Sequence, residues 1–495
     1  MSPLLYTILI PVIAAILIAA GAPARRTAGF ATFINLLWAL SLFALYRTAP
    51  AGIDHYKFVH TWPVLPQFGL NFTLGADGLT LVMLLLATLV SVCAVWASPK
   101  VEKAERAFFI SILMISAGVI GAFVSVDVFF FYAFHELALI PTFLLIGIWG
   151  SGDRQAAAWK ATIYLALGSF VLLIGIIGLY LSIPVLNHRT FDMRALQDLA
   201  AHGGIEKKTW VYFLLLFGFG TLISLFPFHS WAPQAYSSAP APAAMLHAGV
   251  LKKFGLYGLL RLVVPIFPET MQTYMNLLLV LLLCNIIYVG LITVAQKKLD
   301  WMLGYSSVMH MGYIFLGVAG AGMSILSYTG AAILMFAHGL SIAALFALTG
   351  QLRERTGTLE MSQLGGLARK LPVFGLLFGF ATMAGLGLPG FANFAGEILV
   401  FFGAFGTAGV GNNYHALNNY QIATIIALWG VVISAVYMLR AYRNVFLGQP
   451  GVVTADGALD LSGSARLAIT LLIIGLMIIG FYPQLFIHYL APVWH

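Results

Sequence analysis

The sequence Leu222-Ile-Ser-Leu-Phe-Pro-Phe-His-Ser-Trp-Ala-Pro233 interrupts a long apolar run, and Gly385-Leu-Gly-Leu-Pro-Gly-Phe-Ala-Asn-Phe-Ala-Gly-Glu397 interrupts another. A proline inside a helix removes a backbone donor and clashes with the preceding turn. In lipid the freed carbonyl groups need partners, so such breaks persist only inside protein or beside water. Paired breaks in matching positions favour an internal repeat, as in many transporters.

The composition places these runs in a membrane. Of the 495 residues, 61% are hydrophobic and 8% are charged, whereas a soluble domain carries about 25% charged residues. Most of the surface must therefore face lipid. Because a span needs roughly 20 apolar residues, the sequence predicts about 14 helices, centred near residues 12, 38, 88, 116, 138, 172, 218, 252, 284, 310, 338, 390, 432 and 478. The first run, Leu4 to Ala20, lacks a basic leader and is predicted to be a span.

Loops that are rich in lysine and arginine alternate along the chain with loops that contain few of them. Basic residues are retained on the cytoplasmic side of a membrane. With the N-terminus outside, the inner loops hold Arg25, Arg26, Lys100, Lys103, Arg106, Arg154, Lys160, Lys297, Lys298, Arg353, Arg355, Arg369, Lys370, Arg440, Arg443 and Arg466. The outer loops hold Arg47, Lys57, Arg189, Arg194, Lys207 and Lys208, with Arg261 near a helix end. This predicts an even number of spans and both termini outside. It also argues against nucleic acid as a partner, since no basic soluble face remains.

We therefore predict an all-α membrane protein of about 14 transmembrane helices, with two internally repeated five-helix halves and discontinuous helices 7 and 12. The predicted division is residues 1–98 for the first three helices, 99–265 and 266–448 for the two repeats, and 449–495 for the last helix. The two cysteines, Cys93 and Cys284, have no CxxC spacing, so we expect neither a metal site nor a cluster. Gly385 to Gly390 matches GxGxxG but lies in an apolar helix beside a proline, outside any βαβ unit.

Ionisable residues inside the predicted spans are the candidate functional residues. A charged side chain at the bilayer centre costs roughly 2.5–3.5 kcal/mol and usually marks an ion pathway. Glu136, Lys252 and Lys253 lie in the middle of apolar runs, and Glu397 follows the second break. Adjacent helical positions point in different directions, so one lysine is expected to line the interior, while the other snorkels, forms an ion pair or is neutral. For Glu397 the alternative is a partner for a helix N-terminus.

Three histidines, His229, His310 and His338, lie near a break or a polar stretch of a span. A lone histidine is often a satisfied core residue, but histidine titrates nearest neutral pH and can pass protons. Three of them near the other ionisable groups fit a proton relay. Asp77 opens the third span and is expected to cap it.

With these residues placed, the chain resembles the antiporter-like membrane subunits of respiratory complex I, and among them subunit M of NADH–quinone oxidoreductase. The likeness covers essentially the whole length. It rests on Gly75-Ala-Asp-Gly-Leu-Thr-Leu, Phe134-His-Glu-Leu-Ala-Leu-Ile-Pro, Pro227-Phe-His-Ser-Trp-Ala-Pro, Leu251-Lys-Lys-Phe-Gly-Leu-Tyr-Gly-Leu-Leu-Arg, Gly304-Tyr-Ser-Ser-Val-Met-His-Met-Gly, His338-Gly-Leu and Leu388-Pro-Gly-Phe-Ala-Asn-Phe-Ala-Gly-Glu. Subunit M is distinguished from its relatives by a glutamate in the second broken helix, which Glu397 matches.

The resemblance implies a proton-translocating subunit of the bacterial inner membrane that couples quinone reduction to pumping. It implies roles in proton translocation for Glu136, Lys253, His310, His338 and Glu397, with Lys253 as the central lysine. Lys252 and His229 are added to the proton-translocation candidates from their place in the spans alone. It also implies no cofactor in this chain, since NADH, FMN, iron–sulfur clusters and quinone belong to partner subunits. The expected partners are the other membrane-arm subunits, especially neighbouring antiporter-like subunits, and the lipid bilayer.

The sequence also departs from the family. The lysine that pairs with the fifth-helix glutamate is replaced by Leu222, and the usual Asp and His after Trp-x-Pro are Gln234 and Tyr236. The part of the proton pathway that lies in the first repeat is therefore altered. We hypothesise that Lys252 or His135 now forms the pair with Glu136. The alternatives to the complex I assignment are a subunit of a multi-subunit sodium–proton antiporter, the membrane arm of a membrane-bound hydrogenase, and a scaffold that has lost its channel.

Overall fold

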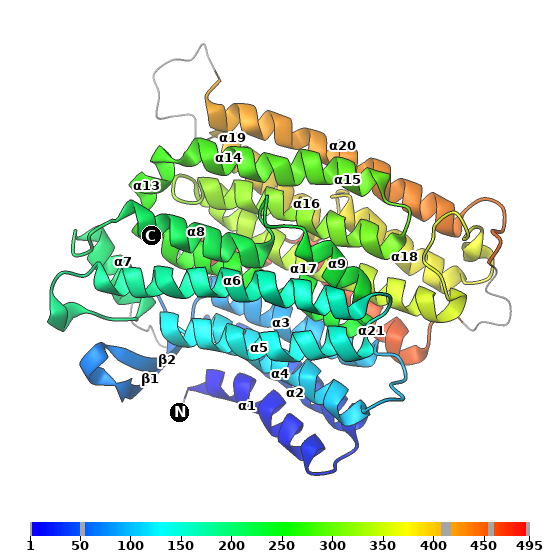
Figure 1. Cartoon of the computed structure of the whole chain (residues 1–495), viewed down its shortest axis with the longest axis horizontal. Helices are drawn as coiled ribbons and strands as arrows, with labels where there is room; N and C mark the ends of the chain where they lie inside the picture. Colours follow the sequence, from blue (N-terminus) through cyan, green and yellow to red (C-terminus); the bar gives the residue numbers. More distant parts are fainter. Residues whose placement is uncertain (1, 50–54, 407–416, 454–459, 492–495) are drawn as a thin grey trace.

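A computed structural model describes residues 2–49, 55–406, 417–453 and 460–491, and its long helices lie side by side, roughly parallel to one another (Figure 1). Ten helices within these ranges are long and apolar enough to cross a membrane: α2 (Ala24–Leu45), α3 (Gly78–Trp96), α4 (Glu105–Val124), α5 (Val128–Trp149), α6 (Arg154–Leu181), the continuous helix Met275–Ala295, α16 (Leu299–Gly320), α17 (Ile325–Thr356), α20 (Asn419–Phe446) and α21 (Gly463–Phe481). Four shorter apolar helices accompany them: α1 (Pro3–Ala19), α8 (Thr209–Ile223), α18 (Pro372–Gly385) and α19 (Ala392–Gly406). The predominantly helical membrane fold is thus confirmed, while the count of 14 stays a prediction.

Both expected interruptions are present. Helix α8 ends at Ser224, which has a left-handed backbone (φ 71°), and the chain resumes as α9 (Trp231–Ser238). Helix α18 is followed by Gly387 at φ 73° before α19 begins. Prolines at 227 and 389 fall inside the two gaps, where the backbone makes no helical bond for the missing N–H to lose.

The helix that carries Lys252 and Lys253 is wound irregularly. It runs through α10 (Ala241–Leu246), η3 (His247–Leu251), α11 (Lys253–Gly258), η4 (Leu259–Val263) and α12 (Val264–Ile266), and η3 and η4 are π-helical turns. The helix Met275–Ala295 contains a third such turn, η5 (Cys284–Tyr288), between α14 (Met275–Leu283) and α15 (Val289–Ala295). Turns of this kind are rare and recur at functional sites.

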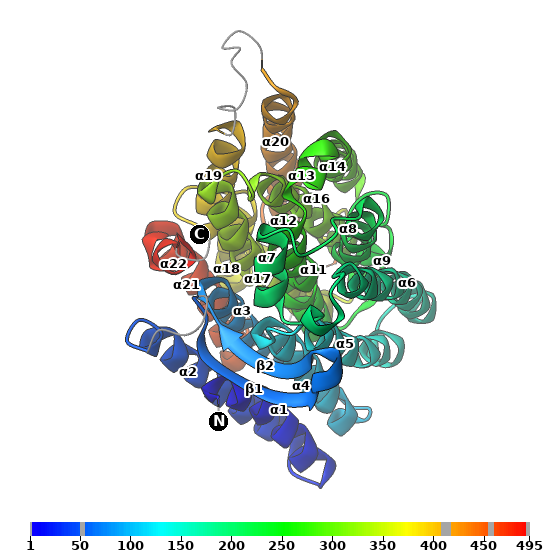
Figure 2. The same cartoon turned by 90° about the vertical axis from the view of Figure 1, so that its left-hand side faces the viewer.

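One end of the bundle carries a cap that the sequence reasoning missed. The antiparallel hairpin β1 (Lys57–Leu65) and β2 (Leu70–Ala76) curves across this end, next to the short helix α7 (Met193–Ala201) (Figure 2). Alternating aromatic residues along β1 and the Pro-Gln-Phe-Gly turn after it were the available signal. Of the remaining short helices, α22 (Gln484–Leu490) packs on α3 and α13 (Pro268–Thr273) leads into α14.

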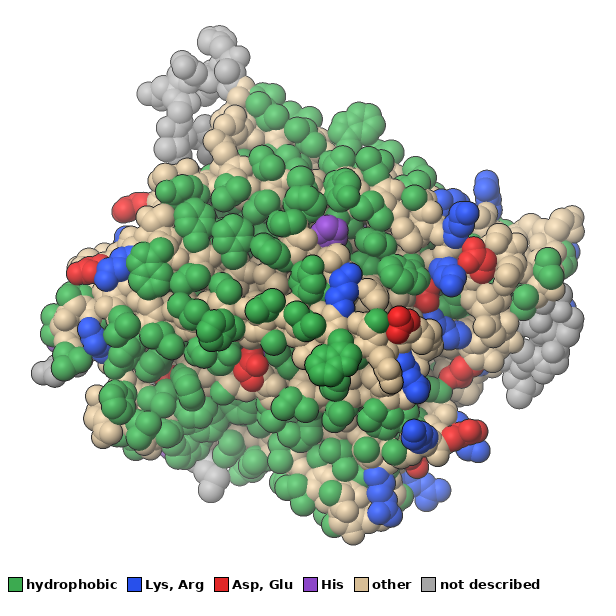
Figure 3. All heavy atoms as spheres, in the orientation of Figure 1, with side chains coloured by type: hydrophobic (Ala, Val, Ile, Leu, Met, Phe, Trp, Pro, Cys, Tyr) green, Lys and Arg blue, Asp and Glu red, His purple; other side chains and the backbone are tan. Residues whose placement is uncertain are grey.

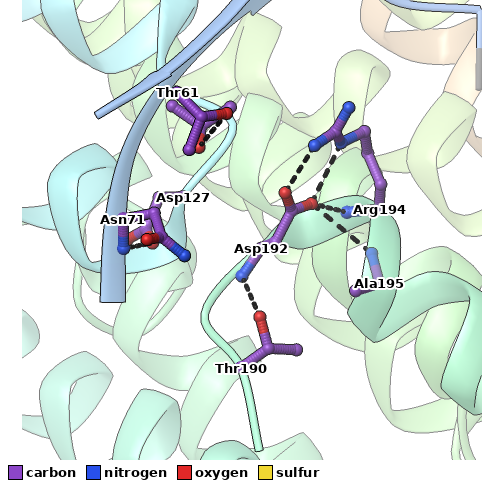
Figure 4. Close-up of polar contacts among 8 residues, drawn as sticks. Thr61, Asn71, Asp127, Thr190, Asp192, Arg194 and Ala195 are labelled. Atoms are coloured by element: carbon purple, nitrogen blue, oxygen red, sulfur yellow. Dashed lines mark hydrogen bonds and ion pairs between the residues drawn. The ribbon is translucent and has the colours of Figure 1, made fainter. Parts of the chain in front are cut away.

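Aspartates fix this cap to the bundle (Figure 4). Asp127 accepts hydrogen bonds from the first backbone N–H groups of α5 and, at 3.3 Å, from Asn71 N of β2. Asp192 caps α7 and pairs with Arg194 at 2.6 Å. Burial raises the pKa of Asp127, which precedes α5, to about 7.

Charge is distributed unevenly between the two ends. On the face drawn in Figure 3, lysine and arginine gather mainly at the end opposite the hairpin, where α6 begins and α20 ends in Figure 1. The first and last residues that the structure describes lie near the hairpin end, because Ser2 Oγ donates to the Phe58 carbonyl and Tyr489 packs against Gly78. This agrees with an even number of crossings. The side of the membrane that each end faces, and the division at residues 99–265 and 266–448, stay predictions.

Candidate functional site

Two adjacent lysines lie at the centre of the bundle. Both are buried, with exposed fractions of 1% for Lys252 and 0% for Lys253. In an α-helix successive side chains diverge by about 100°, but here the π-turn closes on Lys252, whose N–H bonds to the His247 carbonyl at 3.0 Å. We expected only one of the two lysines to line the interior, but packing against neighbouring helices buries both side chains.

The two lysines face different helices. Lys253 Nζ lies 2.8 Å from His338 Nδ1 of α17 and donates to the Ala248 carbonyl at 2.7 Å. Lys252 Nζ lies 3.5 Å from Ser307 Oγ of α16. Since an amine and an imidazole nitrogen can each hold a proton, Lys253 and His338 can exchange one directly.

The chain of polar groups continues from His338 to His310. Their ring centres are 5.8 Å apart, and His310 Nε2 lies 3.3 Å from Tyr437 Oη, which lies 2.8 Å from Ser306 Oγ. Among the described residues, His338 Nε2 and His310 Nδ1 are buried without a hydrogen-bond partner. Buried polar atoms are normally hydrogen-bonded, so these two nitrogens are the atoms of the polar chain that the protein itself leaves unsatisfied.

Glu397 lies at the second broken helix, with an exposed fraction of 4%. Its carboxylate packs so closely on Gly387 that a β-carbon there would collide with it. Tyr313, whose ring centre is 5.7 Å from that of His310, interacts electrostatically with Glu397. Glu397 is in the second turn of α19, beyond the first turn where a helix dipole acts most strongly. The geometry therefore favours membership of the polar chain over a helix-terminus partner.

Glu136 differs from the other groups because its side chain is 36% exposed. It accepts a hydrogen bond from Ser169 Oγ of α6 and lies 3.4 Å from His135 Nδ1. It lines a cavity of about 310 Å³ between α5 and α6. The His135 ring stacks on Phe254 at 4.0 Å, and Phe254 adjoins Lys253 in sequence.

The structure distinguishes between the two hypothesised partners of Glu136. His135 is the nearby base, whereas Lys252 Nζ donates a hydrogen bond to Ser307 Oγ. Leu222, at the position of the family lysine, is buried and lies against Gly168, next to Ser169. An apolar side chain therefore lies near Ser169, the residue that donates to Glu136.

His229 is placed apart from the other histidines. It lies in the gap between α8 and α9, where its ring stacks on Phe226 at 5.5 Å. It interacts electrostatically with Lys252 and Lys160. Among the described residues, its Nδ1 is buried without a hydrogen-bond partner.

A buried ion pair was missed by the sequence reasoning. Arg261, expected near a helix end in the outer loops, is 4% exposed and donates to the carboxylate of Asp77. Its guanidinium also lies 4.9 Å from the ring centre of Tyr257, whose hydroxyl bonds to Thr80. Asp77 also caps α3, as predicted, by accepting from Thr80 N at 2.9 Å. Charged residues far apart in sequence gave no signal that they would pair.

The described residues contain no group of three or more His, Cys, Asp or Glu that could hold a metal ion. Cys93 is buried in α3 and Cys284 begins η5, and neither forms a disulfide.

Comparison with known proteins gives a consistent result. The family described as the transmembrane region of NADH:quinone oxidoreductase and Mrp antiporters matches residues 125–411. NAD(P)H-quinone oxidoreductase chain 4 of Gloeobacter violaceus is 33% identical over 98% of this chain and 90% of its own length. NADH-quinone oxidoreductase subunit M of Rickettsia felis is 33% identical over 84% of this chain and 80% of its own length.

Among solved structures, a chain of respiratory complex I from Thermus thermophilus superposes with a TM-score of 0.87 at 28% identity, covering 100% of this chain and 98% of that chain. That chain is part of a multi-subunit assembly, as the predicted membrane-arm partners require. The protein therefore belongs to the NADH:quinone oxidoreductase and Mrp antiporter membrane-subunit family, with chain 4 and subunit M proteins among its relatives.

Proposed function

We propose that this chain translocates protons as a membrane-arm subunit of an NADH–quinone oxidoreductase. One observation carries the proposal: Lys253, His338 and His310 lie buried in one bundle, joined by a direct contact at 2.8 Å and by neighbouring rings. Glu397 is buried in the same bundle and interacts electrostatically with Tyr313, whose ring neighbours that of His310. Ionisable groups are costly inside a membrane and are kept there for ion pathways.

The driving energy would come from quinone reduction in partner subunits. Moving a proton against 100 mV requires about 2.3 kcal/mol. Glu136 lies beside a cavity at the surface between α5 and α6, where a neighbouring subunit would alter its electrostatic environment. A change of charge there would be relayed through His135 towards Lys253. NADH oxidation and quinone reduction would take place in other subunits.

We place the basic end of the bundle in the cytoplasm, because lysine and arginine are retained on that side. Both termini and the hairpin cap would then face outside the bacterial inner membrane. The two repeats, residues 99–265 and 266–448, would each contribute one half of the pathway, with Glu136 and Lys252 in the first and His310, His338 and Glu397 in the second.

A second candidate is a subunit whose first half no longer conducts. Leu222 occupies the position of the family lysine and packs against Gly168 beside Ser169 and Glu136. In that case Glu136 would be a remnant of the family pathway, and protons would move through the second half alone or not at all.

Proton uptake by inverted membrane vesicles that contain the assembled complex tests both candidates. Pumping should fall strongly in Lys253→Met and Glu397→Gln while NADH oxidation continues with an uncoupler present. Lys297→Met, which removes an exposed lysine, is the matched control and should pump normally. Full pumping by Lys253→Met would overturn the main proposal, and full pumping by Glu136→Gln alone would favour the second candidate.

A further inference from the structure

Two cavities lie at the basic end of the bundle and share part of their walls. The first has a volume of about 180 Å³ and is lined by Tyr236 and Thr349 among others. The second measures about 360 Å³ and is lined by charged residues of the loops. Ser151, Asp300 and Arg353 line both. These three residues therefore form a common wall, and we call the two spaces the inner cavity and the outer cavity.

The common wall is a hydrogen-bonded cluster around one guanidinium group. Arg353 of α17 donates to Ser151 Oγ in the α5–α6 loop, to Asp300 Oδ2 of α16 and, at 3.3 Å, to the Ser237 carbonyl of α9. Charge-assisted bonds of this kind are strong and directional. The Arg353 side chain is nevertheless 31% exposed, so it can move towards solvent without unfolding its surroundings.

The inner cavity ends next to the buried lysines. Tyr236 Oη lies 3.2 Å from His247 Nδ1, and the Tyr236 ring centre lies 5.5 Å from Lys252 Nζ. Thr349 Oγ1 is buried and, among the described residues, has no hydrogen-bond partner. A cavity well above the roughly 10–15 Å³ that one water occupies can be hydrated where polar groups line it. The Thr349 hydroxyl supplies such a group in the mainly apolar wall of the inner cavity.

We propose that these cavities form the entrance for protons from the basic end, with the Arg353–Asp300 pair as the partition between them and Tyr236 as the inner end. The inference rests on the proposed function. A hydronium ion in the inner cavity gives its proton to Tyr236 Oη as the tyrosine's own proton passes to His247 Nδ1. Water remains in the cavity, and His247 carries the added charge until Nε2 releases a proton.

Cysteine labelling tests the entrance without measuring pumping. In the assembled complex, Thr349→Cys should react with a membrane-impermeant, positively charged thiosulfonate reagent added from the basic side, and Arg353→Ala should raise that rate at least tenfold. Thr329→Cys is the matched control, because both threonines are 3% exposed on α17 and Thr329 lines neither cavity. The unmodified chain gives the background rate. Equal labelling rates for Thr349→Cys and Thr329→Cys would overturn the proposal that these cavities are the proton entrance.

Measurements of proton pumping distinguish a failure of this inference from a failure of the proposed function on which it rests. Tyr236→Phe should lower proton uptake at least fivefold, and Tyr236→His, which restores a side chain that carries protons, should recover it. Full pumping by Tyr236→Phe together with loss in Lys253→Met would overturn the entrance and leave the proposed function intact. Full pumping by both variants would overturn both.

Discussion

Glu136 has a histidine of its own helix as its basic neighbour, and replacing that histidine tests whether the first half of the pathway works. His135→Phe keeps an aromatic ring to stack on Phe254, 4.0 Å away, and removes the Nδ1 atom 3.4 Å from the carboxylate. Hydrogen bonds to charged groups contribute about 1.5–3 kcal/mol. Because this contact is long and Glu136 is 36% exposed, the lower value applies. At about 1.4 kcal/mol per factor of ten, proton transfer through Glu136 should slow roughly tenfold.

The assay is quenching of a pH-sensitive dye in inverted vesicles, with NADH oxidation recorded in the same samples. Leu222→Lys supplies the strongest comparison, because it places an ammonium group beside Gly168 and Ser169, next to the Glu136 carboxylate. Added to His135→Phe, it should recover most of the lost pumping. Leu222→Met changes the same position without a charge and should recover none.

Two results would refute this reasoning. Wild-type pumping by His135→Phe would mean that the histidine is not the working partner of Glu136. In the second result, the double variant His135→Phe, Leu222→Lys assembles and oxidises NADH normally without regaining proton pumping. That result would mean that the missing cation beside Glu136 does not limit transfer through the first half.

Three further predictions concern stability and the second half. Arg261→Met leaves the Asp77 carboxylate buried without its partner, which costs about 3–5 kcal/mol and should lower the yield and melting temperature of the assembled complex. Gly387→Ala adds a β-carbon at φ 73° against the Glu397 carboxylate, a conformation that costs about 1–2 kcal/mol, and should lower pumping several-fold. Burial raises the pKa of Asp127 from 3.8 to about 7, so its stabilising contribution is complete below about pH 4 and is lost as the pH rises to 7. Asp127→Asn should therefore remove about 4 kcal/mol, roughly three units at about 1.4 kcal/mol each, from the change in unfolding free energy over this pH range. The measurement is a flatter dependence of the melting temperature on pH.

Matched variants decide each of these predictions. Gly385→Ala also adds a β-carbon near the second break, but it meets the flexible end of Met438 at 3.2 Å, so pumping should be retained. Asp77→Leu combined with Arg261→Met removes both charges and should be less harmful than Arg261→Met alone. Equal melting temperatures for the single and double variants, or an unchanged pH dependence in Asp127→Asn, would contradict the electrostatic arguments.

The sequence by itself determined the architecture. Apolar length and scarce charge dictated a bundle of membrane helices. Every predicted centre falls within a helix or at an expected break, except residue 252, which lies between η3 and α11. Proline and glycine located the two interruptions, because these residues alter the backbone locally whatever surrounds them. The cost of charge in lipid also selected Glu136, Lys253 and Glu397 as candidate site residues.

Only the tertiary structure decided which of these groups meet. The contact of Lys253 with His338 joins residues 85 positions apart, and the Arg261–Asp77 pair joins residues 184 positions apart. Tyr437 becomes part of the polar chain only because α20 packs on α16. Helical periodicity gives the face on which a side chain lies but not the helix opposite it. That choice depends on how all the helices pack together, which is why local sequence could not show that Lys252 lies against Ser307 of α16 while His135 lies beside Glu136.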